Sequence, residues 1–369
     1  MKIAILGSGA MALASAALFA SRGHAPIIWS PSGAGTAGLP QPPRLISIGA
    51  LAGEWDVAAG SDLADAINGA DAVLLAVDAG GHVPVIRAAA PLLAPGVPFL
   101  IGAAHSMSAV YLSELLAARG VELPIVSWNT TVATAHKTGP LAVDIRTLRP
   151  RIEAAVMPSR LEPSALSLCR ELTGTHFEAR PDALAIALLS NANPVFHVPV
   201  CLLNLSRIER GESWAPYEQT TGSIGRLMEA LDAERLAVAS AYGATIHGVN
   251  EHFQRSFRIP LGSMAEMNAH LHAHGRGPKG PRSIDHRYLA QDLSYGLVFA
   301  AEIGRGAGVT TPVHDATIAL ASAAIGRDYR AANALLPLLR LDTMTPEAIR
   351  HRAREGHFEP RAGAGRSFT

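Results

Sequence analysis

A glycine-rich turn near the start of the chain constrains the fold more than any other feature. The apolar run Lys2–Leu6 is typical of a buried strand, and Gly7-x-Gly9-x-x-Ala12 follows it directly, ahead of a helical pattern. Gly7 permits a tight turn, Gly9 lets a phosphate approach the backbone, and Ala12 lets the helix lie close to the strand. The pattern predicts a dinucleotide site at the helix N-terminus, with a bare structural turn as the alternative. The residues expected to contact the dinucleotide are Gly7, Ser8, Gly9, Ala10, Met11 and Ala12.

The segment Met1–Arg22 also has features of a secretory leader, because Lys2 precedes an apolar run that ends in small residues. Gly7 and Gly9 interrupt that run, whereas a strand, a turn and a helix account for the whole segment. We therefore favour the strand, turn and helix over a leader.

Strands and helices alternate after the turn. Apolar runs predict strands that are separated by helical patterns, as expected for a doubly wound parallel α/β sheet. The predicted strands are Lys2–Leu6, Ala25–Trp29, Ala72–Val77, Pro98–Gly102, Ile125–Ser127, Ala154–Met157 and His176–Ala179, and the predicted helices are Asp62–Asn68, Val83–Leu92 and Ser164–Leu172. A dinucleotide-binding domain over residues 1–182 follows from this pattern.

Beyond Asp182 the pattern becomes helical, which predicts an all-α domain over residues 183–369. Its helices are expected at Pro194–Ile208, Ile224–Tyr242, Arg287–Gly304 and Pro312–Ile325. The stretch Gly248–His286 between two of them is predicted as a long loop, either a lid or disordered.

Composition excludes several classes of function. Lys and Arg balance Asp and Glu at 31 each, so the sequence predicts neither a nucleic-acid partner nor an acidic tail. No stretch stands out as a run of roughly 20 apolar residues, so we expect a soluble protein without a membrane span. The two cysteines, Cys169 and Cys201, fit buried thiols in a reducing compartment, the cytoplasm.

The end of the second predicted strand bears on the choice of nicotinamide cofactor. Trp29 is followed by Ser30, Pro31 and Ser32, with no acidic residue to accept hydrogen bonds from ribose hydroxyls. This favours NADP(H) over NAD(H), with the Ser30 and Ser32 hydroxyls as candidate contacts to a 2′-phosphate. Arg44 would have to fold back from the following Gly- and Pro-rich loop to join them.

Among the histidines, His197 has the most informative position. Asn193 and Pro194 predict a helix start that places His197 in the first turn, where the helix dipole disfavours imidazolium. A catalytic His197 would need a carboxylate partner, and a packed or capping role is the alternative.

Three other histidine groups are weaker candidates. His270, His272 and His274 lack a carboxylate or cysteine to complete a metal site, so no metal is expected. His314-Asp315 favours capping of a helix. His105-Ser106 follows a strand near the expected nicotinamide position and is predicted either to touch ligand or to start a helix.

Several motifs follow the glycine-rich turn Gly7–Ala12 along the chain. They are Asn193-Pro194-Val195-Phe196-His197, Tyr217-Glu218, Asp232-Ala233-Glu234-Arg235, Gly280-Pro281, Arg287-Tyr288-Leu289, Asp292, Gly296-Leu297-Val298, Gly308-Val309, Thr311-Pro312 and His314-Asp315. With these motifs the chain resembles the octopine/nopaline (opine) dehydrogenase family over nearly its whole length. The resemblance implies an N-terminal Rossmann domain, a helical C-terminal domain and a cleft between them.

Members of that family reduce the imine formed from a 2-oxo acid and an amino acid. By resemblance, His197 and Asp292 match the catalytic histidine and aspartate, and Arg287 matches an arginine that grips a substrate carboxylate. The implied partners are therefore a 2-oxo acid and an amine or amino acid. A homodimer is one possible oligomeric state, which the sequence leaves open.

The chain departs from the family pattern at three places. Ser127-Trp128-Asn129-Thr130 replaces a segment that begins with Glu, Gln291 replaces a Glu, and Asn333 stands where the family has a carboxylate-binding arginine. These departures suggest an amino substrate of altered charge, either an amine or an unusual amino acid.

Two other classes remain open. Ketopantoate reductases and related hydroxyacid dehydrogenases share the two-domain plan and use a lysine at the carbonyl, for which only Lys137 would serve here. A non-catalytic NAD(P)-binding sensor is the second alternative.

Overall fold

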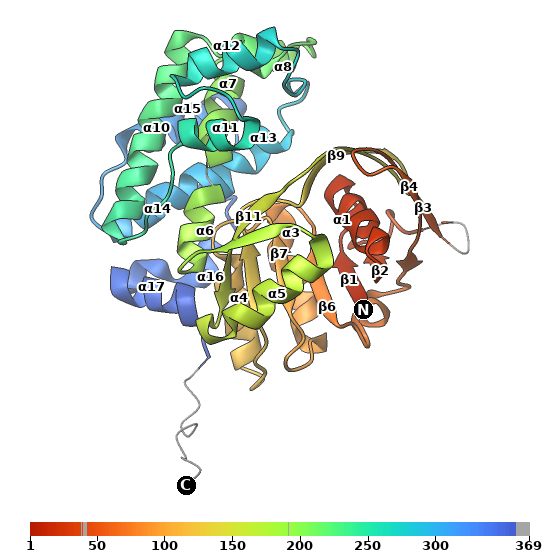
Figure 1. Cartoon of the computed structure of the whole chain (residues 1–369). Helices are drawn as coiled ribbons and strands as arrows, with labels where there is room; N and C mark the ends of the chain where they lie inside the picture. The colour runs from red at the N-terminus through yellow and green to blue at the C-terminus, as the bar shows by residue number, and fades with distance from the viewer. Residues whose placement is uncertain (38, 40–42, 191, 359–369) are drawn as a thin grey trace.

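The computed structural model describes residues 1–37, 39, 43–190 and 192–358, and residues 38 and 40–42 of the predicted Gly- and Pro-rich loop lie outside these ranges. The described chain forms an α/β part, above which a helical part sits in Figure 1. The large sheet of the described residues has the spatial order β12 (His176–Ala179), β11 (Arg151–Met157), β8 (Ile125–Trp128), β7 (Phe99–Gly102), β6 (Ala72–Leu75), β1 (Lys2–Leu6), β2 (Ala25–Trp29) and β5 (Ala58–Ala59).

Apolar, mostly buried strands and flanking helices produce the doubly wound arrangement that the sequence predicts. One buried cluster includes side chains of α1 and α5, and another includes side chains of α2, α3 and α4. These helices are α1 (Ala10–Ser21), α2 (Leu63–Ile67), α3 (Ala79–Ala89), α4 (Ser108–Ala117) and α5 (Glu162–Thr173).

The predicted doubly wound parallel sheet has one antiparallel pairing, at β11. This strand pairs with β8 in the antiparallel direction, although β8 pairs with β7 in parallel. The chain reaches β11 through the hairpin of β9 (Ala133–Gly139) and β10 (Ala142–Leu148), so no crossover helix turns β11 to the direction of its neighbour.

A second, smaller sheet covers α1 (Figure 1). Its strands lie in the order β4 (Gly53–Asp56), β3 (Arg44–Gly49), β10 and β9. The sequence does not predict this sheet, because its two hairpins come from distant parts of the chain and meet only through the β3–β10 pairing. Its position brings β9 across the helix that follows the glycine-rich turn.

The helical part begins at α6 (Ala183–Ser190). Its further helices are α7 (Ala192–Leu202), α8 (Leu205–Glu209), α9 (Pro216–Gln219), α10 (Gly222–Ala241), α11 (Val249–Phe257), α12 (Met264–Ala273), α13 (Arg287–Ala290), α14 (Phe299–Gly306), α15 (Pro312–Ile325), α16 (Leu336–Leu339) and α17 (Pro346–Glu355). A π-helical segment, Asp292–Val298, separates α13 from α14, so the predicted helix Arg287–Gly304 is interrupted.

The prediction that Gly248–His286 is a long loop is wrong. The stretch contains α11 and α12, and Ser263 and Glu266 form a capping box at the start of α12. This Ser-x-x-Glu spacing was a readable helix signal. His270 and His272 therefore lie in the last turn of α12, and His274 follows this helix directly.

The segment Ala183–Leu202 is long and apolar enough to cross a membrane, which corrects the expectation that no such stretch exists. Within the protein, 94% of its most apolar window is buried, as in a core helix. We keep the division at residues 182 and 183 as a proposal. Side chains of α6, α16 and α17 join the buried cluster of α2, α3 and α4, so these helices attach the helical part to the α/β part.

Candidate active site

His197 and Asp292 form a hydrogen-bonded pair in the helical part. His197 lies on α7, and Asp292 opens the π-helical segment. The distance from His197 Nδ1 to Asp292 Oδ2 is 2.6 Å, and the two side chains are 10% and 3% exposed. The helix contact between α7 and the π-helical segment thus joins residues that are 95 positions apart. π-Helical segments are rare and often occur at functional sites.

Aromatic packing fixes the orientation of the imidazole. The His197 ring stacks on Tyr288, with 3.5 Å between centroids and 12° between planes. Phe196 meets the same ring edge-on at 5.4 Å. Within the described residues, His197 Nε2 has no hydrogen-bond partner in the protein, and this atom is not completely buried. Nε2 is therefore the ring nitrogen that remains available to a ligand.

The protonation states of the pair follow from burial and from their mutual bond. Burial lowers the pKa of His197, and this outweighs Asp292, which acts to raise it. Burial acts to raise the pKa of Asp292, but the hydrogen bond from His197 holds that pKa below its usual range. The pair is therefore a neutral imidazole that donates Nδ1–H to a carboxylate at neutral pH.

The guanidinium of Arg287 acts electrostatically on both His197 and Asp292. Arg287 is exposed at the start of α13, with its guanidinium 5.5 Å from the centroid of the Tyr288 ring. Its charge acts to lower the pKa of both His197 and Asp292. In the described part of the chain no carboxylate lies within ion-pair distance of Arg287, so a substrate carboxylate is a fitting partner.

Two of the departures from the family pattern have structural roles. Gln291 Oε1 accepts a hydrogen bond from Ala79 N at 2.9 Å, which ties the residue before Asp292 to the first turn of α3. Asn333 is buried and donates to Ser294 O at 2.8 Å and to Ser106 Oγ at 3.2 Å. The Asn333 amide thus links the α/β part to the helical part, at a position where an arginine would offer a cation to the substrate.

The glycine-rich turn fits a dinucleotide. Gly7 has a φ of +146°, and a Cβ there would collide with the carbonyl oxygen of Ala76. A Cβ on Gly9 would meet nothing within 4 Å, so open space lies beside this backbone. Helix α1 has no side-chain cap, which leaves its first N–H groups available to phosphate oxygens. Ala12 is buried, whereas Ala10 and Met11 form the first, partly accessible turn.

The serines after β2 lie together near this turn. Ser30 Oγ is 3.4 Å from Ser32 Oγ and accepts a hydrogen bond from Gly35 N at 3.2 Å. Arg44 does not fold back to them, because it begins β3 and forms ion pairs with Glu54 and Asp56. No arginine therefore supports the serines from that loop.

Two other candidate histidines contact polar side chains of neighbouring elements. His314 Nδ1 lies 2.7 Å from Glu234 Oε2, and Glu234 also accepts the His314 and Val313 backbone N–H groups at the start of α15. This is a helix cap, as expected, although Glu234 supplies it instead of Asp315. His105 Nε2 lies 3.5 Å from Gln291 Nε2. No group of three metal-ligating side chains occurs among residues with described positions.

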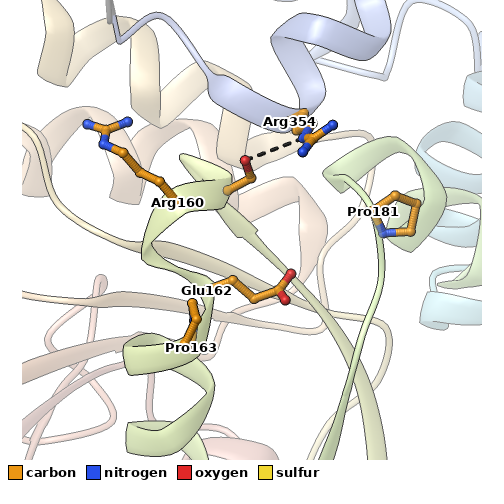
Figure 2. A pocket seen from close by; sticks show the side chains of 6 residues that line it. Arg160, Glu162, Pro163, Pro181 and Arg354 are labelled. Atoms are coloured by element: carbon orange, nitrogen blue, oxygen red, sulfur yellow. Dashed lines mark hydrogen bonds between the residues drawn. The ribbon is translucent and has the colours of Figure 1, made fainter. Parts of the chain in front are cut away.

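A surface pocket elsewhere contains none of these groups (Figure 2). Arg160 pairs with Glu122, and Arg354 contacts both Ser159 and Glu355. Its lining residues are Ser159, Arg160, Glu162, Pro163, Pro181 and Arg354. Because protein groups already satisfy both arginines, we assign this pocket no function.

The glycine-rich turn, the mainly parallel sheet and the buried His–Asp pair are together typical of an NAD(P)-dependent oxidoreductase. Residues 180–325 match the family model described as NAD/NADP octopine/nopaline dehydrogenase, alpha-helical domain. The helical part of the chain is therefore similar to that of opine dehydrogenases.

Known proteins match almost the whole chain. An opine dehydrogenase of Arthrobacter sp. (strain 1C) is 29% identical over 94% of this chain and 97% of its own length. An octopine dehydrogenase solved with NADH and agmatine has a TM-score of 0.78 at 19% identity, covering 97% of this chain and 100% of its own. A yersinopine dehydrogenase with bound NADP⁺ has a TM-score of 0.69 at 16% identity, covering 95% of this chain and 98% of its own.

Proposed function

We propose that the chain catalyses the NAD(P)H-dependent reductive condensation of a 2-oxo acid with an amino acid or amine, with His197, Asp292 and Arg287 as its reacting centre. The observation that carries this assignment is the buried 2.6 Å bond between His197 and Asp292. Opine dehydrogenases are related to this chain over both domains. The carboxylate of the oxo acid pairs with Arg287, which holds the carbonyl beside His197.

His197 Nε2 then acts first as a base and afterwards as an acid, and it transfers the same proton in both steps. It first removes a proton from the ammonium group, and the freed amine adds to the carbonyl carbon to form a carbinolamine. Asp292 stabilises the resulting imidazolium through the Nδ1 bond. The imidazolium next donates its proton to the departing hydroxyl, so that water leaves and a protonated imine remains.

The turn residues Gly7–Ala12 would hold the pyrophosphate of the cofactor, which supplies hydride to the imine carbon when bound. The product is a secondary amine. Tyr288 keeps the imidazole plane fixed throughout, because its ring lies against the full face of His197.

For the cofactor we propose NADP(H) over NAD(H). The hydroxyl groups of Ser30 and Ser32 follow the end of β2. No carboxylate stands there, and a carboxylate would repel the 2′-phosphate. We also keep a cytoplasmic location and a homodimer as proposals, the former supported by the two buried free thiols.

The lysine-dependent alternative is disfavoured by the position of Lys137. Its Nζ donates to the carbonyl of Ser8 in the glycine-rich turn, at the cofactor end of the site. A carbonyl-activating lysine would instead lie beside His197 and Asp292. The complete His–Asp pair also argues against a non-catalytic sensor.

A substrate matrix tests the proposed function. Purified protein is incubated with NADPH or NADH and with pairs of 2-oxo acids and amines, and products are identified by mass spectrometry. We expect a secondary amine, with the mass of both substrates less one water plus two hydrogens. Hydroxy acid formed equally well without amine would instead identify a carbonyl reductase, and no cofactor oxidation across the matrix would identify a sensor.

Replacement of Arg287 tests the carboxylate contact. Arg287→Met is expected to raise KM for the oxo acid by about 10- to 100-fold, because a charge-assisted bond to a carboxylate is lost. Steady-state kinetics at saturating cofactor measure this, with Arg282→Met in the preceding loop as the matched control. A KM that is the same in both variants would remove Arg287 from the site.

A further inference from the structure

One lysine from the small sheet reaches the glycine-rich turn. Lys137 lies on β9, and its Nζ donates a hydrogen bond to Ser8 O at 2.9 Å across a separation of 129 residues. The chain has only three lysines, and in the described ranges no carboxylate forms an ion pair with this one. A lysine ammonium has three N–H donors, so the carbonyl of Ser8 leaves donors of Lys137 for another acceptor.

Hydroxyl groups gather at the same place. An added Cβ on Gly35 would collide with Ser8 Oγ and would lie 2.9 Å from Ser30 Oγ, so both hydroxyls adjoin Gly35. Ser32 Oγ is 3.4 Å from Ser30 Oγ, and Gly35 N points at Ser30. The glycine-rich turn and the end of β2 thus contribute hydroxyl groups to one small region. The Lys137 ammonium adjoins this region, because it donates its hydrogen bond to the Ser8 carbonyl.

The fold explains why a residue so distant in sequence occupies this position. The small sheet lies against α1, the helix that follows the glycine-rich turn (Figure 1). The β9–β10 hairpin extends along this helix, and Lys137 pairs with Val143 in its register. The arginine nearest to β2 in the following loop, Arg44, is held by Glu54 and Asp56.

We propose that Lys137 is the cation that binds the 2′-phosphate of NADP(H), with the hydroxyls of Ser8, Ser30 and Ser32 as further ligands. The proposal rests on the proposed preference for NADP(H). The ribose 2′ position of a bound dinucleotide lies at the end of the second strand, beside the glycine-rich turn. A phosphate monoester there needs a positive charge and several donors, and this cluster offers both without a competing carboxylate.

Equilibrium binding tests the proposal without turnover. NADPH, NADH and adenosine 2′,5′-bisphosphate are titrated by calorimetry into the wild type, Lys137→Met, Lys137→Arg and the control Lys279→Met, in which another exposed lysine is changed. We expect Lys137→Met to raise Kd for NADPH and for the bisphosphate by about 10- to 100-fold, since a charged hydrogen bond is lost. Its Kd for NADH should change by less than about twofold, and Lys137→Arg should retain much of the affinity for NADPH.

The outcomes separate this proposal from the one on which it rests. A wild type that binds NADH as tightly as NADPH overturns the cofactor preference and the role of Lys137 together. A wild type that prefers NADPH, with an unchanged ratio of affinities in Lys137→Met, overturns only the role of Lys137. An equal loss of affinity for NADPH and NADH also overturns it, because Lys137 would then act on a part common to both cofactors. Thermal melting confirms that each variant is folded.

Discussion

His197→Asn is expected to reduce kcat for the condensation by about 10²- to 10⁴-fold, the usual contribution of a general acid–base group. The asparagine amide fills part of the imidazole volume against Tyr288 but cannot accept and return a proton at neutral pH. Affinity for NADPH should remain close to that of the wild type, because the glycine-rich turn belongs to the other domain. Stopped assays of the secondary amine and calorimetric titration of NADPH provide the two measurements.

The chain offers a matched control for this variant. His314 is fully buried and lies 2.7 Å from Glu234, so it repeats the His–carboxylate geometry at the start of α15. His314→Asn should lower the melting temperature, because it disturbs a helix cap, while kcat of the folded enzyme stays near the wild-type value. Equal losses of kcat in both variants would mean that His197 supports the fold rather than the reaction.

The sequence predicted the strands of the large sheet other than the two-residue β5, because their signals are local. Apolar strands, the Gly-x-Gly turn and helices with regular apolar spacing each fall within a few residues, and β12 and α15 have the predicted bounds. The direction of β11 and the existence of the small sheet depend on pairings between distant segments, such as β3 with β10, which no local pattern encodes. The helices α11 and α12 were missed although the capping box of α12 was visible.

The residues of the candidate site likewise fall into those that a local motif predicts and those that depend on distant contacts. The glycine-rich turn is a local motif with a physical meaning at each position, so it could be read without a structure. The partnership of His197 and Asp292 came from family resemblance, because residues on α7 and on a later π-helical segment carry no mutual spacing signal. The stacking of Tyr288 and the bond from Ala79 to Gln291 were not anticipated, since both depend on how the domains pack.

Asp292→Asn is expected to lower kcat by about 10²- to 10⁴-fold, because the imidazolium that forms during the reaction loses its compensating charge. An amide oxygen still accepts Nδ1–H of His197, so the variant removes charge more than geometry. Circular dichroism and calorimetric titration of NADPH establish that the folded variant still binds cofactor.

The pH profile of this variant distinguishes loss of charge from structural damage. The first step requires neutral His197, so the rate falls as the pH decreases through the pKa of the imidazole. Asp292 acts to raise that pKa, and its removal must move the acid limb of kcat to lower pH. Gln291→Glu adds a carboxylate next to Asp292 and preserves an acceptor for Ala79 N, so its acid limb should move to higher pH. Opposite displacements in the two variants would identify His197 as the titrating group, whereas an unmoved limb in both would assign the titration to another residue.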